Sequence, residues 1–568
     1  MATSQHRPLP AALAACAALA LSLVAAPAAA DTLVDDIDGL RVDRDGKVTR
    51  FEAMLIDDAG RVAALYERGD KRKKDPDYRV DGRGRVLLPG FIDAHVHLTQ
   101  LGFAALTLDL SETRSLDEAL ARIREYAVRY PDRRWIVGQG WNQEAWGLGR
   151  FPTAAELDAV VSDRAVWLGR VDGHAGWANS LALSEAGVTA ATKDPAGGRI
   201  ERSSDGKPAG VLVDAAAALV QAKVPPPLPE ERDLALTRAQ DLLLSRGITA
   251  VHDMGTTLAD WQALRRSGDY GRLSLRVVSY ASGIEDMVTI AGPGPSPWLY
   301  GDRLRLAGVK LYLDGALGSR GAWLKQPYAD APGQTGLPTM NGTQLRNLMS
   351  RAAMDEFQVA VHAIGDAANA EAIMAVAELN ESFEGDRRWR IEHAQIVEPA
   401  DIALFAATGA IASMQPLHQA SDRTMAEARL GIDNLAGAYA WKSLETAGVP
   451  LAFGSDAPVE KPDVLAGMAV AISRQDASGQ PFGGWTPGER IDRQSALAAY
   501  TAGAAYAGGS DKRYGSLAVG EWADFVFLTG DPLIASPEEL RTMRVLETWI
   551  AGRKAWEARS SVPSGERR

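Results

Sequence analysis

The chain has 568 residues, of which 46% are hydrophobic and 24% are charged, and its formal net charge at pH 7 is −12. This composition is typical of a folded globular protein, and the length allows one large domain with smaller ones beside it. The negative charge disfavours nucleic acid as a partner, because such a surface repels phosphate backbones. One basic run, residues 71–74, is flanked by aspartates and predicts a solvated hairpin tip rather than a binding patch.

The first part of the chain, residues 1–30, predicts a secretory signal peptide. Arg7 precedes an apolar stretch, and the small residues Ala28 and Ala30 stand just before Asp31. We therefore expect an exported protein, periplasmic or secreted, without a stable membrane span. A membrane anchor is the alternative, but the stretch is rich in alanine and interrupted by proline.

The chain has one cysteine, Cys16, and it lies inside this first segment. The tetrapeptide from Leu13 to Cys16 resembles a bacterial lipobox, so lipoprotein processing at Cys16 is a rival prediction. If the segment is removed as a signal peptide, no thiol remains for a disulfide, for nucleophilic catalysis or for metal binding.

Short strand-like segments separated by glycine-containing turns occur near both ends of the chain. Residues 31–84 predict strands joined by hairpins, and residues 509–560 repeat this texture. We expect the two pieces to assemble into one small β-sandwich domain that flanks a long α/β middle part.

The middle part, residues 85–508, alternates apolar, β-branched runs with helical patterns, as βα units do. Eight of these runs are predicted to be buried parallel strands, which is the number that closes a (β/α)8 barrel. They are residues 85–95, 247–253, 273–280, 305–313, 358–364, 388–394, 409–416 and 449–456. The expected fold class is therefore α/β, with a TIM barrel as the main domain.

A long interval follows the first predicted strand. Between His97 and Gly247 lie roughly 150 residues, many more than an ordinary connection between a strand and a helix needs. We expect residues from about 100 to 240 to form an inserted unit that covers the catalytic face of the barrel.

Side chains suited to metal binding stand at or just after the C-terminal ends of five predicted strands. They are His95, His97, Lys310, His362, His393 and Asp456. The C-terminal ends of barrel strands meet at the face that carries the active site. Histidines two residues apart on a strand point to the same side, and histidine and carboxylate groups bind zinc. The pattern predicts a metal centre that activates water.

Lys310 lies in an otherwise apolar strand, where a buried lysine needs a reason. Its protonated amine cannot bind a metal, but a lysine carbamylated by carbon dioxide becomes an anionic bridge between two metals. The alternative is a lysine paired with Asp314 or another carboxylate.

Three residues are candidates for catalysis. Asp456 is placed to bind metal and to accept a proton from the activated water. His418 follows the seventh predicted strand and is a candidate to hydrogen bond a substrate oxygen. His174 lies in the insertion and is a candidate to orient substrate.

Other residues of the insertion have two interpretations. Asp172 and Asn179 either orient substrate or hold a loop in place. Trp141, Trp146 and Trp177 either form the wall of an apolar pocket or pack the interior of the insertion.

Together these motifs resemble those of the amidohydrolase superfamily, specifically its amidohydrolase-3 branch, which includes N-substituted formamide deformylase-like proteins. The matching motifs are PGFIDAHVH, RVDGHAGWANS, KLYLDGALGSR, HAIGDAAN, RIEHAQ, MQPLH and GSDAPVE. The resemblance extends from about residue 33 to 557. It implies that the six residues named above bind one or two divalent metals per subunit, with zinc as the expected metal.

We therefore predict an exported, metal-dependent hydrolase that cleaves a non-peptide C–N bond of a small molecule, a linear amide or an N-substituted formamide. One alternative is a cyclic-amide hydrolase or a deaminase with a single metal. Another is an extracytoplasmic binding protein that retains a metal site without catalysis. The sequence does not name the substrate, because specificity resides in the insertion and the loops, and it leaves a homo-oligomer open.

Overall fold

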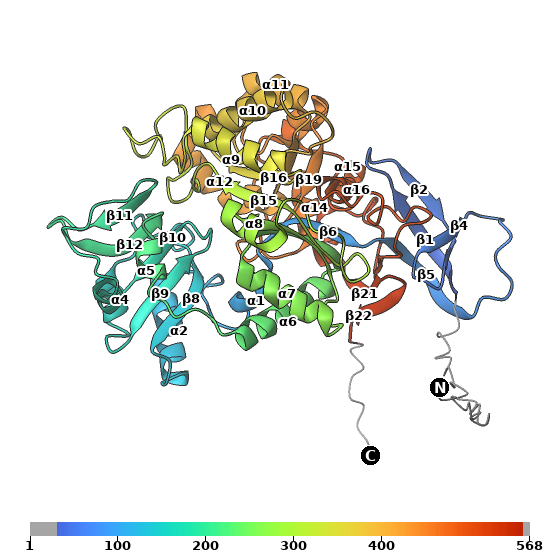
Figure 1. Ribbon diagram of the computed structural model, residues 1–568, viewed down its shortest axis with the longest axis horizontal. Coiled ribbons are helices and arrows are strands. Elements are labelled where there is room, and N and C mark those ends of the chain that lie inside the picture. The colour runs from blue at the N-terminus through green and yellow to red at the C-terminus, as the bar shows by residue number, and fades with distance from the viewer. Residues whose placement is uncertain (1–30, 560–568) are drawn as a thin grey trace, which may run out of the picture.

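The computed structural model describes residues 31–559; the predicted signal peptide, which contains Cys16, lies outside this range. Figure 1 shows a central barrel, with the insertion on one side and a sheet made from both ends of the chain on the other. Within the described range, no helix is long and apolar enough to cross a membrane.

Eight parallel strands form the central barrel, and their order around the sheet follows their order in the chain. They are β6 (Phe91–Val96), β13 (Ile248–Thr256), β14 (Arg276–Ser282), β15 (Leu304–Tyr312), β16 (Gln358–Ala363), β17 (Arg390–His393), β18 (Ile411–Met414) and β19 (Leu451–Phe453). A parallel bridge between Val96 and Ala457 brings the last strand back to the first. The predicted (β/α)8 barrel is confirmed.

The barrel strands are buried on both faces, which explains their continuous apolar sequences. In β13 all but one of the residues are buried, and in β15 all but two. Helices between the strands cover the outer face of the barrel. They include α6 (Pro229–Ser245), α7 (Leu258–Asp269), α8 (Ile284–Ala291), α9 (Gly342–Met354), α10 (Asp366–Asn380), α11 (Ile402–Thr408), α12 (Pro416–Leu430), α13 (Trp441–Thr446), α14 (Val464–Ser473), α15 (Arg493–Ala499) and α16 (Ala502–Ala507).

The insertion after β6 has a sheet and a core of its own. Its strands lie in the order β11-β12-β10-β9-β8-β7. Its elements are β7 (Leu108–Asp109), α2 (Leu116–Arg129), β8 (Trp135–Trp141), α3 (Ala154–Asp158), β9 (Ala165–Arg170), β10 (Ala175–Ala178), α4 (Ser180–Glu185), β11 (Gly198–Arg202), β12 (Pro208–Asp214) and α5 (Ala218–Gln221). Helix α1 (Leu98–Ala104) leads into it from the barrel, and α6 leads back.

Strands from both ends of the chain join in one sheet, in the order β22-β21-β20-β5-β1-β3-β4, with β2 paired to β1. They are β1 (Thr32–Val42), β2 (Val48–Phe51), β3 (Ala53–Ile56), β4 (Val62–Tyr66), β5 (Tyr78–Pro89), β20 (Phe525–Leu528), β21 (Val545–Ile550) and β22 (Arg553–Glu557), with α17 (Pro537–Thr542) before β21. Only Gly90 separates β5 from β6, so this sheet continues directly into the barrel.

A buried ion pair also joins the terminal sheet to the barrel. The guanidinium of Arg276 on β14 donates to Asp524 through Nε at 2.5 Å and through Nη2 at 2.9 Å. Both residues are almost completely buried. The pair fixes the base of β14 against the chain that leads into β20.

Candidate metal centre

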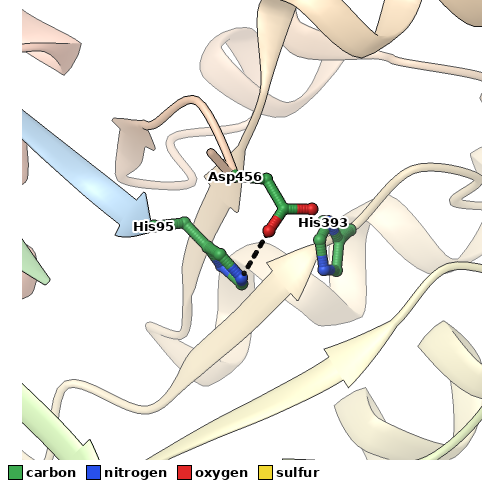
Figure 2. Close-up of side chains that lie close together, drawn as sticks. All are labelled: His95, His393 and Asp456. Carbon is green, nitrogen blue, oxygen red and sulfur yellow. Dashed lines mark ion pairs between the residues drawn. The ribbon is translucent and has the colours of Figure 1, made fainter. Parts of the chain in front are cut away.

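The predicted ligands come together at the C-terminal ends of the barrel strands. His95 is the fifth residue of β6, His393 is the last residue of β17, and Asp456 follows β19. Their side chains point toward one another (Figure 2). All three residues are buried, and each offers one ligand atom such that these atoms lie within 4.8 Å of one another.

Two of these residues have backbones in the left-handed region, with φ of 71° at His393 and 60° at Asp456. Residues other than glycine adopt this region at a cost, and such strain persists where the surrounding structure enforces it, often at functional sites. In each case the turn directs a side chain from a strand end toward the centre of the group.

The remaining predicted ligands surround these three. His97 Nε2 lies 3.2 Å from Asp456 Oδ1, and His95 Nε2 lies 3.4 Å from the same oxygen. Lys310 Nζ lies 3.2 Å from His95 Nε2. The ring centre of His362 is 4.5 Å from that of His393. The fold thus gathers all six predicted residues, although they come from five different strands or strand ends.

Lys310 does not pair with Asp314. The Asp314 carboxylate accepts three backbone N–H groups, from Trp323, Ile364 and Gly365, and lies 3.5 Å from His362 Nε2. Burial lowers the pKa of Lys310 to about 8, so its ammonium form is destabilised relative to the neutral amine.

Hydrogen bonds set the orientation of two of the histidine rings. His95 Nδ1 lies 2.6 Å from Glu392 Oε2, and His393 Nδ1 lies 2.8 Å from Gln415 Oε1. Carboxylate and amide oxygens only accept hydrogen bonds, so both Nδ1 atoms donate. The lone pair of each ring is therefore on Nε2, the nitrogen available to a metal.

Two buried atoms of the six predicted ligands have no hydrogen-bond partner among the described residues. They are Asp456 Oδ1 and His362 Nε2. Buried polar atoms are normally satisfied by a partner, an ion or ordered water. A carboxylate oxygen and an imidazole nitrogen left free at a cluster of histidines fit a divalent metal such as zinc.

The charge states of the site also suit a metal. Burial lowers the pKa of His95 to about 4, and it holds the pKa values of His362 and His393 well below the ordinary histidine value. These rings are neutral at pH 7, as metal ligands must be. Burial acts to raise the pKa of Asp456, but His418 and His97, whose Nε2 atoms lie 3.2 Å from its two oxygens, hold it well below its usual range, so this residue is ionised.

The two additional candidate residues contact different members of the group: the ring of His418 is 6.1 Å from that of His393, and His174 lies near His362. His418 on α12 places Nε2 3.2 Å from Asp456 Oδ2. Although burial opposes it, hydrogen bonds to Asp456 and Glu460 raise the pKa of His418 to about 10. The two oxygens of Asp456 thus face different residues: Oδ1 lies near His95 and His97, and Oδ2 lies near His418.

His174 lies in the loop between β9 and β10, so the insertion contributes it to the site. Its Nδ1 is 2.7 Å from Asp214 Oδ1, and its ring centre is 5.2 Å from that of His362. Burial acts to lower the pKa of His174, but Asp214 raises it to about 9. Asp214 was missed in the sequence, because it lies 40 positions from its partner and follows no motif of its own.

A cavity of about 320 Å³ opens above the centre. The barrel lines its floor with His362, His393 and Asp456. The rest of its wall comes from the insertion, from the loop after β15 and from α12; these residues include Asn142, Glu144, Arg170, Asp172, His174, Leu317, His418, Asp422 and Met425. The cavity is therefore shared between the barrel and the insertion.

The structure decides between the two interpretations for the other insertion residues. Trp141 and Trp177 are fully buried in the core of the insertion, and Trp146 packs against this core, so the tryptophans do not line the cavity. Asn179 caps α4 by accepting from the Ala182 N–H. Asp172 does line the cavity, where it forms an ion pair with Arg170.

All seven histidines of residues 31–559 lie in or directly beneath this site, including His252. Histidine clustering was therefore a signal that the sequence contained. Glu392 and Gln415 were not recognised, although Glu392 stands next to His393 in the RIEHAQ motif.

Comparisons with known proteins agree with this arrangement. A family model described as the amidohydrolase family matches residues 79–555. The chain is 35% identical over 500 residues to the protein LONG AFTER FAR-RED 3 of Arabidopsis thaliana, covering 85% of this chain and 84% of that protein. It is 28% identical over 559 residues to N-substituted formamide deformylase of Arthrobacter pascens, covering 91% of this chain and 97% of that enzyme.

Among solved structures, an uncharacterized metal-dependent hydrolase from Pyrococcus horikoshii OT3 is similar to this chain. The TM-score is 0.72 and the sequence identity 26%, over 89% of this chain and 99% of that one.

Proposed function

The chain belongs to the amidohydrolase family, and on that premise we propose that it hydrolyses a non-peptide C–N bond of a small linear amide or N-substituted formamide. One observation carries the proposal. His95, His393 and Asp456 present ligand atoms within 4.8 Å of one another, at the floor of a cavity of about 320 Å³. A site of this kind suits a small molecule better than a polypeptide.

The proposed cofactor is zinc, one or two ions per subunit. His95, His97, His362, His393 and Asp456 would hold it, together with Lys310 as a carbamate bridge in a two-metal form. When bound, the metal would act as a Lewis acid that polarises the substrate carbonyl, and it would lower the pKa of a water molecule so that hydroxide is available to attack the carbonyl.

The side chains of the protein would then handle the proton. Asp456 is ionised, and its Oδ1 accepts no hydrogen bond from the part of the chain that the structure describes, so it can take a proton from the attacking water and deliver it to the departing amine. His418 holds the other oxygen of Asp456 in place at 3.2 Å. His174, oriented by Asp214, lies at the cavity wall, where it can donate a hydrogen bond to the carbonyl oxygen of the substrate.

The amide class is favoured by similarity to N-substituted formamide deformylase, which extends over 91% of this chain. A cavity shared with the insertion suits a compact acyl group and a modest amine substituent. The loop residues that line it would set the preference between amines.

Metal analysis combined with a substrate panel tests this function. The panel contains N-substituted formamides, other linear amides, cyclic amides, amino-substituted rings and dipeptides. Hydrolysis of a formamide or linear amide that is lost with a chelator and restored by zinc is the expected result. Cleavage restricted to cyclic amides, or release of ammonia from a ring, would replace the proposal with those alternatives. Bound metal without turnover of any class would indicate a binding protein.

We also propose that the enzyme is exported and that the mature chain begins at or near Asp31. Ala28 and Ala30 satisfy the small-residue preference of signal peptidase. N-terminal sequencing of exported protein measures this directly, and a lipidated start at Cys16 would contradict it.

A further inference from the structure

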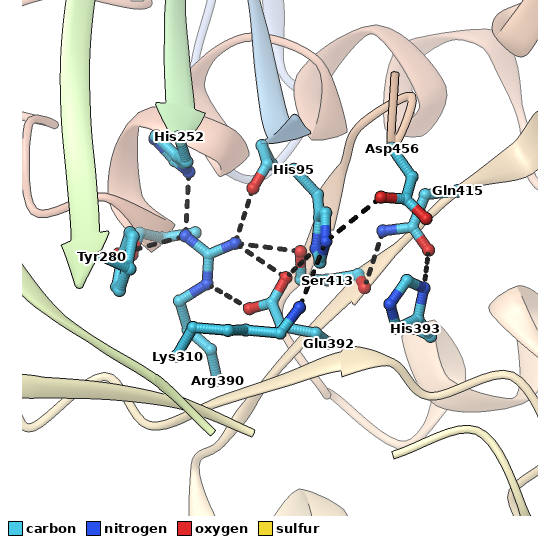
Figure 3. Close-up of polar contacts among 12 residues, drawn as sticks. His95, His252, Tyr280, Lys310, Arg390, Glu392, His393, Ser413, Gln415 and Asp456 are labelled. Carbon is cyan, nitrogen blue, oxygen red and sulfur yellow. Dashed lines mark hydrogen bonds and ion pairs between the residues drawn. The ribbon is translucent and has the colours of Figure 1, made fainter. Parts of the chain in front are cut away.

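A cluster of polar side chains lies beneath His95, in the interior of the barrel (Figure 3). It contains Arg390 and Glu392 on β17, His252 on β13, Tyr280 on β14 and Ser413 on β18. All five residues are completely buried. They do not line the cavity, so substrate does not reach them.

Arg390 is at the centre of this cluster. Its Nε donates to Glu392 Oε1 at 2.7 Å, and its Nη1 donates to His252 Nδ1 at 2.8 Å and to Tyr280 Oη at 3.1 Å. Its Nη2 donates to the Ala94 carbonyl at 2.7 Å, next to His95 on β6. The guanidinium therefore fixes both the Glu392 carboxylate and the strand that carries His95.

Folding stability alone does not explain the buried ion pair between Arg390 and Glu392. Removing an arginine and a glutamate completely from water costs several kcal/mol per ion, and apolar side chains of similar size are often as stabilising. The contact made by the second oxygen of Glu392 suggests a functional reason for the ion pair. Glu392 Oε2 lies 2.6 Å from His95 Nδ1, so the carboxylate that Arg390 holds accepts the ring proton of a candidate ligand.

We propose that Glu392, held by Arg390, is a positioning residue that sets the metal affinity of the site through His95. It fixes the ring so that Nε2 faces Asp456, and its negative charge makes that nitrogen a stronger electron donor. The inference rests on the proposed metal centre, and it adds Glu392 as a residue that controls the metal affinity of this centre without contacting the metal.

His393, the other candidate ligand whose Nδ1 has a hydrogen-bond acceptor, can be compared with His95. His393 Nδ1 lies 2.8 Å from Gln415 Oε1, an oxygen of a neutral amide. Both rings are oriented, but only His95 has an ionised acceptor. The site is therefore asymmetric, and loss of Glu392 should weaken metal binding more than loss of Gln415.

The test measures metal affinity rather than turnover. Zn²⁺ and Co²⁺ dissociation constants are determined by competition with a chromophoric chelator for the wild type, Glu392→Gln and Gln415→Met. We expect Glu392→Gln to bind either metal about 10–100-fold more weakly, and Gln415→Met to show a smaller loss. The visible spectrum of the Co²⁺ form should also change in Glu392→Gln, because a neutral amide replaces the ionised acceptor of the His95 ring.

Asp524→Asn is the matched control. It removes the charge of another buried carboxylate, the partner of Arg276 at 2.5 Å, and Arg276 begins β14, at the opposite end of the strand from the candidate metal centre. This variant should lose thermal stability but keep wild-type metal affinity. Unchanged affinity and an unchanged Co²⁺ spectrum in Glu392→Gln, with stability lowered as in Asp524→Asn, would show that Glu392 is only structural and would overturn the inference.

Glu392→Asp replaces Glu392→Gln in the metal-affinity test if the Gln variant does not fold. It keeps the charge for Arg390 but withdraws the carboxylate from His95, so weaker metal binding is expected and wild-type affinity would overturn the inference. A wild-type protein that binds metal but hydrolyses no amide would refute only the proposed function. A wild-type protein that binds no metal would refute both.

Discussion

Asp456 connects most of the functional groups at the residue scale. One oxygen lies near His95 and His97, and the other faces His418. His418 and His97 favour its ionised form and hold its pKa well below the usual range, although burial acts in the opposite direction. A carboxylate that is ionised, buried and only partly satisfied is suited both to bind a cation and to carry a proton.

Replacing Asp456 by asparagine separates these two roles. Asparagine has nearly the same size and keeps one oxygen for a metal, but it cannot carry a proton. We expect metal to remain at least partly bound while kcat falls by ~10²–10⁴-fold, as measured by metal analysis and steady-state kinetics on an active amide. Retained metal with wild-type turnover would assign the proton transfer to another group, and His174 and His418 would be tested first.

Lys310 provides a second test at this scale. Its buried position lowers its pKa to about 8, which favours the neutral amine that reacts with carbon dioxide. We expect Lys310→Ala to lose one metal and most activity, and to recover part of the activity when short carboxylic acids are added.

Lys442→Ala is the matched control for this rescue, because Lys442 is a partly exposed lysine paired with Glu445 on α13. It should keep full activity and show no response to the acids. A crystal structure with an unmodified Lys310 ammonium and a single metal would contradict the carbamate bridge, although not the hydrolase.

At the scale of elements, the site depends on how closely β19 and β6 approach where the barrel closes. Asp93 joins the two strand ends, accepting from the Ser455 N–H at 2.8 Å and from the Ser455 hydroxyl at 2.5 Å. A Cβ atom at Gly454 would lie 2.4 Å from the backbone nitrogen of His95. Only glycine allows this contact, so the glycine of the FGSDAP motif is required by packing.

We therefore expect Gly454→Ala to separate the strand ends that carry His95 and Asp456. The free energy of unfolding should fall by ~1–3 kcal/mol, and metal content should fall with it. Denaturant unfolding and metal analysis measure the two effects. Gly488→Ala is the control, because a Cβ atom there meets nothing within 4 Å. Equal losses of unfolding free energy and metal content in Gly454→Ala and Gly488→Ala would contradict the packing argument.

At the scale of the whole molecule, the candidate ligands span the chain from His95 to Asp456. An unfolded chain cannot hold these residues together, so a metal that binds them favours the folded state. The insertion adds His174 to the same cavity, so the barrel and the insertion form the site jointly.

Metal should therefore stabilise the whole protein. Free metal at a hundred times its dissociation constant adds about 2.7 kcal/mol to the free energy of unfolding, and calorimetry should show a higher Tm with zinc than with a chelator. His97→Ala and His393→Ala should fold, lose activity and bind less metal, and zinc should raise their Tm less. Near-normal metal content and turnover in both variants would refute the metal assignment.

Much of the fold was predictable because its signals are local. Most barrel strands are largely apolar runs, and the metal-suited residues stand at or near the ends of the strands, where the geometry of a parallel barrel brings them together. The family resemblance inferred from the motifs is confirmed over residues 79–555. The secretory signal and the identity of the metal remain predictions.

The roles of the supporting residues were not predictable, because they depend on contacts between distant parts of the chain. Glu392 and His95 are 297 positions apart, and His174 and Asp214 are 40 apart. Asp314, a predicted partner of Lys310, instead accepts from backbone N–H groups of its own loop and of the loop after β16.

The barrel could therefore be predicted from the sequence, because periodicity and strand ends are encoded along the chain, and the same signals predicted the insertion and the candidate metal ligands. The acceptor that orients each histidine, the tryptophans that pack the insertion and the residues that line the cavity could be identified only in the folded protein. These depend on distances between side chains, which arise only when the strands close into a barrel and the insertion packs against it.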